Sequence, residues 1–176
     1  MDGLKLHIGG TTAKAGWSIL NIQPGPGVDY VGSATDLSAI DDASCAEVYA
    51  SHVLEHLAYD TELPQAMKEI HRVLKPGGRV RVAVPDLSVI CRLFASPQSK
   101  FKDRYELMRM MFGGQTDEHD FHYAGLWPAF LDALLREAGF TNIERVSSFG
   151  EFKDASEATH SGERISLNMQ AYKQGV

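Results

Sequence analysis

The sequence is poor in cysteine, has fewer basic than acidic residues, and lacks any long apolar run. Its two cysteines, Cys45 and Cys91, are too few for the disulfide framework of a small secreted domain. The 17 Lys and Arg residues face 23 Asp and Glu residues, a net charge of −6, which argues against salt-driven binding to nucleic acid or to an anionic membrane. The apolar runs fall far short of the about 20 residues that span a bilayer. We therefore expect no disulfide framework, no nucleic-acid partner and no membrane span.

What remains is the composition of a globular protein. Of the 176 residues, 44% are hydrophobic and 23% are charged, which is enough apolar surface for one core of ordinary size. The first residues do not have the charged-then-apolar pattern of a secretory signal. We expect a single domain over residues 1–176, located in the cytoplasm.

Short apolar or β-branched runs, bounded by glycine, proline, aspartate or serine, predict strands along the chain. In the first part of the sequence these strands are Leu4–Ile8, Ser18–Ile22, Val28–Val31 and Ala46–Ala50. Further along they are Arg79–Val84, Thr141–Ser147 and Ile165–Tyr172. Some of the gaps between the early strands are too short for a helix of ordinary length.

Two segments have apolar residues at helical spacing, and two more are compatible with helices. The clearest helix spans Asp60–Lys75 and ends at a Lys-Pro-Gly-Gly sequence, and the second spans Trp127–Ala138 with Gly139 as its stop. Leu87–Phe94 and Phe101–Phe112 are the other two. Strands that alternate with helices predict an α/β fold with a mostly parallel sheet, whose ligand site lies at the carboxyl ends of the strands.

A histidine-rich run follows one of these predicted strands. His52, Glu55 and His56 have the spacing of the inverted zinc-peptidase motif. Zinc chemistry also needs a third ligand and both histidines on one helical face. The run lies at a junction between a strand and a helix, and no downstream segment stands out as the third ligand, so we set the zinc-peptidase interpretation aside.

Residues 117–123 form a second cluster of ionisable groups, ahead of the last predicted helix. His119 and His122 in this loop are candidates for a general base, because imidazole titrates near neutral pH. A solvated polar loop is an equal alternative, and a metal site made by these two histidines is a further one. A basic stretch elsewhere has Lys68, His71, Arg72 and Lys75 on a predicted helix, with Arg79 and Arg81 beyond it. On the helix, most of these residues are interpreted as the solvated face of an amphipathic segment.

A series of segments has the order of motifs found in one known family. They are Leu6–Gly10, Gly16-Trp17, Val28–Leu37, Ser51–Leu57, Arg72–Gly78, Val82–Asp86 and Leu134–Phe140. Together they resemble the small class I S-adenosylmethionine (SAM)-dependent methyltransferases, over nearly the whole chain. The most specific element is the Leu-Lys-Pro-Gly-Gly sequence between a helix and a strand.

The resemblance implies a Rossmann-like fold, with a mostly parallel seven-stranded sheet and a reversed last strand. The subgroup that the chain most resembles has a short link between the first and second strands, so the first helix is expected to be reduced or absent. This subgroup is often found beside bacterial surface-polysaccharide genes. The resemblance thus implies a bacterial protein with SAM as its cofactor and a small molecule or saccharide as its acceptor.

Site residues follow from the resemblance by position. Gly9 and Gly10 would lie against the methionine part of SAM, Asn21 and Gln23 would meet the ribose, and residues from Ser33 to Leu37, including Asp36, would frame the adenine. Ser51 and His52 would flank the methyl group. The catalytic candidates are His122, His119, His52 and His56. The prediction includes no metal ion.

The chain departs from the family at its acidic anchors. Where the family has an acid in the first strand, this chain has His7 and Ile8; at the end of the second strand, it has Asn21 and Gln23. Ser33 replaces the acid on the adenine side. Each carboxylate exchanged for a neutral group loses charge-assisted hydrogen bonds worth about 1.5–3 kcal/mol.

Two functions therefore compete. The first is methyl transfer from SAM to an oxygen of a small-molecule or saccharide acceptor, with one histidine as the base. The alternative is a degenerate methyltransferase fold that no longer binds SAM and acts as a binding or scaffold module. A second copy of the chain is also an expected partner, because the lost first helix would leave apolar sheet surface uncovered.

Overall fold

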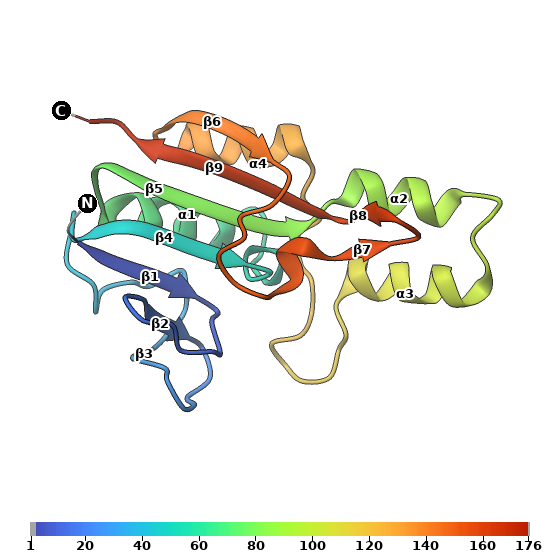
Figure 1. Cartoon of the computed structure of the whole chain (residues 1–176), viewed down its shortest axis with the longest axis horizontal. Helices are drawn as coiled ribbons and strands as arrows, with labels where there is room; N and C mark the ends of the chain where they lie inside the picture. Colours follow the sequence, from blue (N-terminus) through green and yellow to red (C-terminus); the bar gives the residue numbers. More distant parts are fainter. Residues whose placement is uncertain (1–2, 176) are drawn as a thin grey trace.

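The computed structural model describes residues 3–175, and its centre is one seven-stranded sheet (Figure 1). The strand order is β3-β2-β1-β4-β5-β9-β6. The bounds are β1 Leu4–Ile8, β2 Ser18–Asn21, β3 Tyr30–Val31, β4 Cys45–Ser51, β5 Leu74–Pro85, β6 Phe140–Val146 and β9 Ser166–Lys173. Strands β1 to β5 pair in parallel, whereas β9 runs antiparallel to both of its neighbours, β5 and β6. This arrangement confirms the predicted fold, including the reversed last strand.

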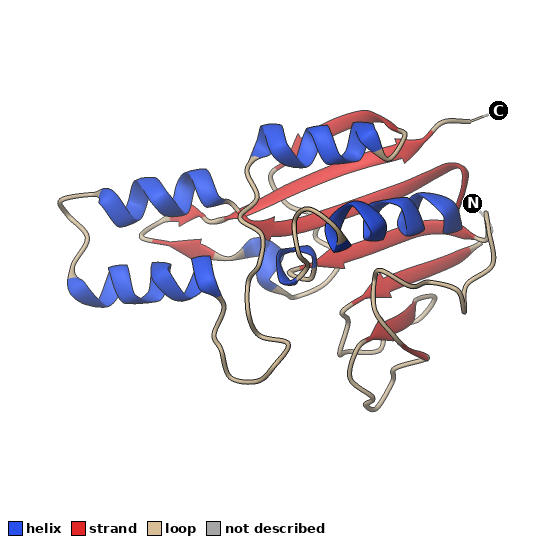
Figure 2. Cartoon of the chain, turned by 180° about the vertical axis from the view of Figure 1, so that it is seen from behind, coloured by secondary structure: helices blue, strands red, loops and turns tan. Residues whose placement is uncertain are grey.

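The helices lie mainly on one face of the sheet, as Figure 2 shows. The α-helices are α1 Glu62–Val73, α2 Leu87–Ala95, α3 Phe101–Phe112 and α4 Pro128–Glu137, and the 3-10 turns are η1 Leu54–His56 and η2 Ala155–Glu157. The hairpin of β7 Thr159–His160 and β8 Glu163–Arg164 lies with α2 and α3 at one end of the molecule (Figure 1). Within the described residues, no helix is long and apolar enough to cross a membrane.

The main core fills the space between the sheet and its helices. Because side chains alternate across a strand, Val80, Val82 and Val84 of β5 all point into this core and are completely buried. They pack in one apolar cluster with residues from α1, such as Met67 and Ile70. The charge–valine alternation of this segment was thus read correctly as a strand.

The opposite face of the sheet has no helix between β1 and β2, because residues 9–17 form only turns and bends. The first helix is therefore absent, as predicted. The loop after β6 covers part of this face, since the ring of Phe152 lies 4.1 Å from that of His7 and 4.9 Å from that of Tyr49, centroid to centroid. The uncovered surface that suggested a homodimer is thus partly covered by the chain itself, and the dimer stays a prediction.

Several element boundaries differ from those predicted. The helix expected over Asp60–Lys75 spans only Glu62–Val73, because β5 begins at Leu74, which pairs with Cys45 of β4. The strand expected over Val28–Val31 is reduced to two residues at the edge of the sheet, where Tyr30 pairs with Leu20. An edge strand has hydrogen bonds to one neighbouring strand only, so its length is set by how many residues pair with that neighbour and not by its own apolar run.

Candidate functional site

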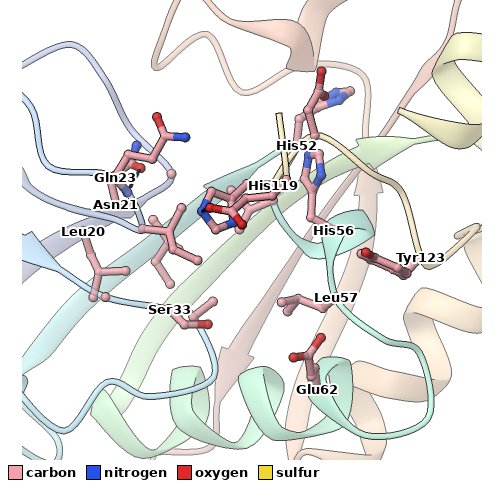
Figure 3. Close-up of a pocket in the computed structure, with 18 of the residues that line it drawn as sticks. Leu20, Asn21, Gln23, Ser33, His52, His56, Leu57, Glu62, His119 and Tyr123 are labelled. Atoms are coloured by element: carbon pink, nitrogen blue, oxygen red, sulfur yellow. Dashed lines mark hydrogen bonds and ion pairs between the residues drawn. The ribbon is translucent and has the colours of Figure 1, made fainter. Parts of the chain in front are cut away.

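A cavity of about 490 Å³ lies at the carboxyl ends of β1, β2 and β4 (Figure 3). This is the edge of the sheet at which the sequence analysis placed the ligand site. Most of its lining comes from the loops after these strands and from the segment between α3 and α4. The residues around it include Gly9, Asn21, Gln23, Ser33, His52, His56, Glu62, His119, Asp120 and Tyr123.

Gly9 forms the floor of the cavity at the end of β1. Its φ of 78° lies in the left-handed region, and a Cβ built on it would come within 2.3 Å of Val53 Cγ2. Its backbone N–H donates to the carbonyl of Leu20, 2.7 Å away. Only glycine therefore lets β1 turn here while Val53 from the loop after β4 approaches the backbone.

Two amide side chains, Asn21 and Gln23, stand at the end of β2 and just beyond it. The Asn21 side chain donates from Nδ2 to the Gly10 carbonyl at 3.0 Å and accepts from the Gln23 backbone N–H at 3.0 Å. The Asn21 amide thus ties the loop after β1 to the loop after β2. Figure 3 shows both side chains on one side of the cavity. The Asn21 side chain is held by the two loops, whereas Gln23 is placed to contact a ligand in the cavity.

Ser33 also lines the cavity, but the other residues expected near the adenine do not. Leu37 is completely buried in the core, and Asp36 is exposed, where its carboxylate accepts from the Ser38 backbone N–H at 3.0 Å. Hydrogen bonds from Ser38 lower the pKa of Asp36. Gly10 and Ser51, next to cavity residues in sequence, do not line it either.

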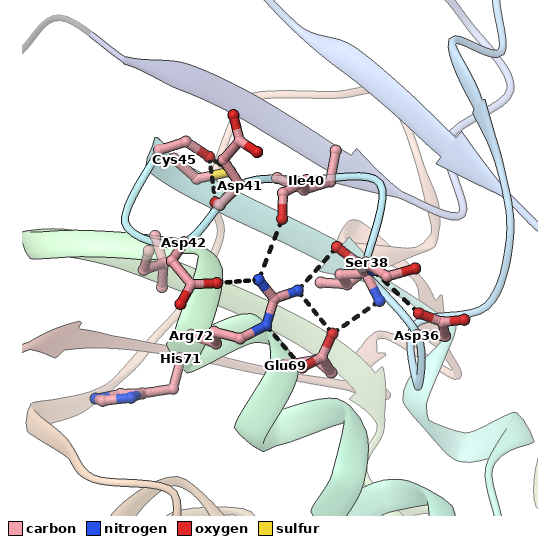
Figure 4. A network of polar contacts seen from close by, with 12 residues as sticks. Asp36, Ser38, Ile40, Asp41, Asp42, Cys45, Glu69, His71 and Arg72 are labelled. Carbon is pink, nitrogen blue, oxygen red and sulfur yellow. Dashed lines mark hydrogen bonds and ion pairs between the residues drawn. The ribbon is translucent and has the colours of Figure 1, made fainter.

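The loop that carries Asp36 and Leu37 is held by Arg72 of α1 (Figure 4). The Arg72 guanidinium donates to the backbone carbonyls of Leu37 and Ile40, at 2.8 and 3.1 Å. It also binds the carboxylates of Glu69 and Asp42. The interpretation of Arg72 as part of a solvated face was wrong, because the loop folds back over this side of α1 and offers it three acceptors, with Glu69 of the same helix as the fourth.

His52 stands at the end of β4 and contacts two other segments. Its φ of 54° places it in the left-handed region. One ring nitrogen, Nε2, lies 2.9 Å from Ser166 Oγ of β9, and the other, Nδ1, lies 3.2 Å from Glu55 Oε1. The unusual backbone angle turns the ring so that it lines the cavity while both nitrogens meet protein groups.

His56 and His122 lie against each other, with ring centroids 4.7 Å apart. His56 lines the cavity, whereas His122 lies behind it and does not. His56 Nδ1 is 3.0 Å from the Phe121 carbonyl, and His122 Nδ1 is 2.9 Å from the Met110 carbonyl. Burial lowers the pKa of His122, although the nearby Glu55 carboxylate acts in the opposite direction.

His119 belongs to the wall contributed by residues 117–120. Figure 3 shows it between the amides of β2 and the histidines that follow β4. The loop that carries it is closed by Asp120, whose carboxylate accepts from Thr116 Oγ1 at 2.7 Å and from the Gly114 backbone N–H at 3.3 Å. The Thr116 hydrogen bond is the main cause of a lowered Asp120 pKa.

Two further polar residues line the cavity without a role predicted for them, Glu62 and Tyr123. Glu62 begins α1, where its carboxylate accepts from the Ala58 backbone N–H at 2.9 Å. Tyr123 follows the histidine loop, and its backbone N–H donates to the Glu55 carbonyl at 2.8 Å. The position of Tyr123 beside His122 could have indicated its place in the cavity. Nothing in the sequence around Glu62 indicated more than the start of a helix.

The comparisons with known proteins agree with this geometry. A family described as "Methyltransferase domain" matches residues 14–82, which run from the loop before β2 into β5. Residues 14–82 thus match a methyltransferase domain, and the whole chain has the fold of SAM-dependent methyltransferases. The cofactor that the matches to this domain support is SAM.

Solved methyltransferase structures resemble this chain over almost its full length. A SAM-dependent methyltransferase of Thermotoga maritima, described as a possible histamine N-methyltransferase, aligns with 99% of this chain and 84% of its own, at a TM-score of 0.60 and 20% identity. The 1,6-didemethyltoxoflavin-N1-methyltransferase of Burkholderia thailandensis, solved with 1,6-didemethyltoxoflavin and S-adenosylhomocysteine, aligns with 97% and 71%, at a TM-score of 0.59 and 17% identity.

A third structure is longer than the methyltransferase domain. Human N-acetylserotonin methyltransferase, solved with SAM, aligns with 97% of this chain and 47% of its own, at a TM-score of 0.57 and 15% identity. No curated protein matches the sequence significantly. Identities this low establish the fold and leave the acceptor to be inferred from the site.

Proposed function

We propose that this protein transfers a methyl group from SAM to an oxygen atom of a small-molecule acceptor, most simply a saccharide. The observation that carries the proposal is a single cavity with two chemically different sides. One side consists of glycine, amides and a hydroxyl (Gly9, Asn21, Gln23 and Ser33), and the other has histidines. Neutral donors and acceptors suit a nucleoside, and imidazoles suit a hydroxyl that must lose its proton.

The residues at the end of β1 and β2 fit the cofactor. Gly9 lines the cavity at the end of β1, and Gln23 offers an amide to ribose hydroxyls. The cofactor supplies an activated methyl group, which leaves positioning and water exclusion to the protein. The cavity volume of about 490 Å³ lies within the roughly 300–1,000 Å³ of ordinary ligand sites.

We assign the general base to His119. Unlike His122, it lines the cavity, and unlike His52 and His56, its ring has no hydrogen bond with another part of the described chain, its nearest charged partner being the Glu118 carboxylate at 3.8 Å. An imidazole in this position takes the acceptor's hydroxyl proton as the oxygen attacks the methyl carbon. His52 borders the cavity at the end of β4 and orients the acceptor.

The first test is calorimetric titration of the protein with SAM and with S-adenosylhomocysteine. We expect micromolar binding, and a Gln23→Ala variant is expected to bind about tenfold more weakly, because it loses hydrogen bonds worth about 1.4 kcal/mol. Gln65→Ala is the matched control, since Gln65 lies on the exposed side of α1 and does not line the cavity. No binding at millimolar cofactor would favour the alternative, a binding or scaffold module.

The second test concerns the base. A His119→Gln variant is expected to bind S-adenosylhomocysteine normally but to transfer methyl groups about 100-fold more slowly or worse, in line with the usual contribution of a general base. Transfer would be followed by mass spectrometry of saccharides incubated with SAM and the protein. Equal rates for both proteins would remove His119 from the mechanism.

A further inference from the structure

Behind the histidine side of the cavity, three potential metal ligands converge. Glu55 and His56 belong to η1, and His122 comes from the segment between α3 and α4. One ligand atom from each lies within 4.8 Å of the other two. Ligands of a tetrahedral zinc ion lie about 3.4 Å apart, so the three atoms would have to draw together by up to about 1.4 Å.

The carboxylate of Glu55 is the second, independent observation. Its residue is only 1% exposed, and neither carboxylate oxygen has a hydrogen-bond partner within the described part of the chain. The contact of His52 Nδ1 with Oε1, at 3.2 Å, offers one oxygen an ion pair and leaves Oε2 with nothing. A buried carboxylate without hydrogen bonds is costly, and a metal ion is one of the few groups that compensate it.

In both histidines, a backbone carbonyl fixes which ring nitrogen is protonated. A carbonyl oxygen can only accept, so Nδ1 of His56 carries a proton for the Phe121 carbonyl, and Nδ1 of His122 carries one for the Met110 carbonyl. In the neutral ring, Nε2 then has a free lone pair. Metal-binding histidines in proteins usually have this same backbone contact on the far nitrogen.

The backbone also fixes the two segments to each other. The Glu55 carbonyl accepts from the N–H groups of both Tyr123 and Ala124, at 2.8 and 3.1 Å, and the His122 N–H donates to the Phe112 carbonyl. The three ligand side chains are thus held together by main-chain hydrogen bonds that need no metal.

We propose that Glu55, His56 and His122 bind a divalent zinc ion through one carboxylate oxygen and two Nε2 atoms. Two imidazoles and one carboxylate are a common ligand set for zinc, which then keeps a fourth position for water or another oxygen ligand. Because His56 lines the cavity, that position lies next to it. An acceptor oxygen as fourth ligand would rest on the proposed methyl transfer; the metal binding itself does not.

The test measures metal binding directly. Protein dialysed against a chelator is titrated with zinc chloride by calorimetry, and the cobalt form is examined by visible spectroscopy. We expect one ion per chain, with the cobalt absorption of a four-coordinate nitrogen and oxygen site. Glu55→Gln and His122→Ala are each expected to lower the zinc affinity at least tenfold.

The matched control is His119→Ala, which removes a histidine of the same loop that does not belong to the cluster. It is expected to keep full zinc affinity. His56→Ala serves as a further variant, since His56 is partly exposed and its loss spares the core. Absence of stoichiometric zinc binding, or equal binding by the wild type and His122→Ala, would overturn the proposal. Titration with S-adenosylhomocysteine in chelator tests the cofactor site separately.

Discussion

At the scale of single residues, the sharpest constraint in the site is Gly9. It combines a φ of 78° with a steric limit, since an added Cβ would approach Val53 Cγ2 to 2.3 Å. Gly16 in the same loop has a similar φ of 81° but nothing within 4 Å of an added Cβ. An alanine at Gly16 would therefore cause backbone strain alone, whereas an alanine at Gly9 would cause the same strain and also overlap with Val53.

We predict that Gly9→Ala lowers the free energy of unfolding more than Gly16→Ala does. Left-handed strain alone costs about 1–2 kcal/mol for a non-glycine residue, and this is the loss expected for Gly16→Ala. Gly9→Ala adds the displacement of Val53, for a total of about 3 kcal/mol. Urea denaturation of both variants would measure the difference, and equal losses would show that Val53 moves aside freely.

At the scale of elements, Arg72 fixes the loop between β3 and β4 to helix α1. The four acceptors around its guanidinium come from Glu69 of the same helix and from Leu37, Ile40 and Asp42 of the loop. This loop follows Ser33, so its position sets one wall of the cavity. A planar group with several donors is required, because a single ammonium cannot reach all of these oxygens.

We predict that Arg72→Lys lowers the free energy of unfolding by about 2 kcal/mol, because it breaks hydrogen bonds from a charged donor to buried carbonyls. Arg136→Lys on α4 is the matched control. Arg136 is largely exposed and contacts only Asp132 of its own helix, so its replacement is expected to change stability by less than about 0.5 kcal/mol. Thermal denaturation would compare the two, and similar effects would contradict the structural role of Arg72.

At the scale of the whole molecule, the helix-free face of the sheet is closed by aromatic and ionic contacts. The rings of Trp17, Tyr49 and Phe152 surround His7, and the buried Arg81 forms ion pairs with Glu47 and Glu151. Arg81 is therefore buried on this face of the sheet. Its side chain points to this face, where the loop after β6 covers it.

Burial lowers the pKa of His7 to about 4. In the unfolded chain His7 takes up a proton near pH 6.5, whereas in the folded protein it does so only near pH 4. The unfolded state thus binds more protons between these values, so His7 stabilises the fold fully above about pH 6.5 and loses about 3 kcal/mol of that as the pH falls to 4.

The corresponding prediction is that His7→Phe flattens the pH dependence of stability in this window. The difference in unfolding free energy between wild type and variant should be constant above about pH 6.5 and should shift by about 3 kcal/mol in favour of the variant by pH 4. Urea denaturation at a series of pH values would measure it. Parallel curves down to pH 4 would mean that His7 is accessible to water.

The fold class could be predicted from the sequence, because the alternation in β5 and the helical spacing in α1 are local patterns that follow from burial of one face. The edge of the sheet where the cavity lies was also predictable, and Gly9, Asn21, Gln23, Ser33, His52, His56 and His119 line that cavity, while their roles stay predictions. It took the three-dimensional arrangement to show which of the predicted residues do not line the cavity, namely Gly10, Asp36, Leu37, Ser51 and His122.

The reason is that these assignments depend on chain segments far apart in sequence. Asp36 and Leu37 leave the cavity because Arg72 holds their loop on α1, and His122 meets Glu55 and His56 because main-chain hydrogen bonds join the two segments. Periodicity reports which face of an element is buried, but not which distant loop covers it. The ligand set proposed for zinc therefore depends on the contact between η1 and the segment that carries His122, which the sequence pattern does not indicate.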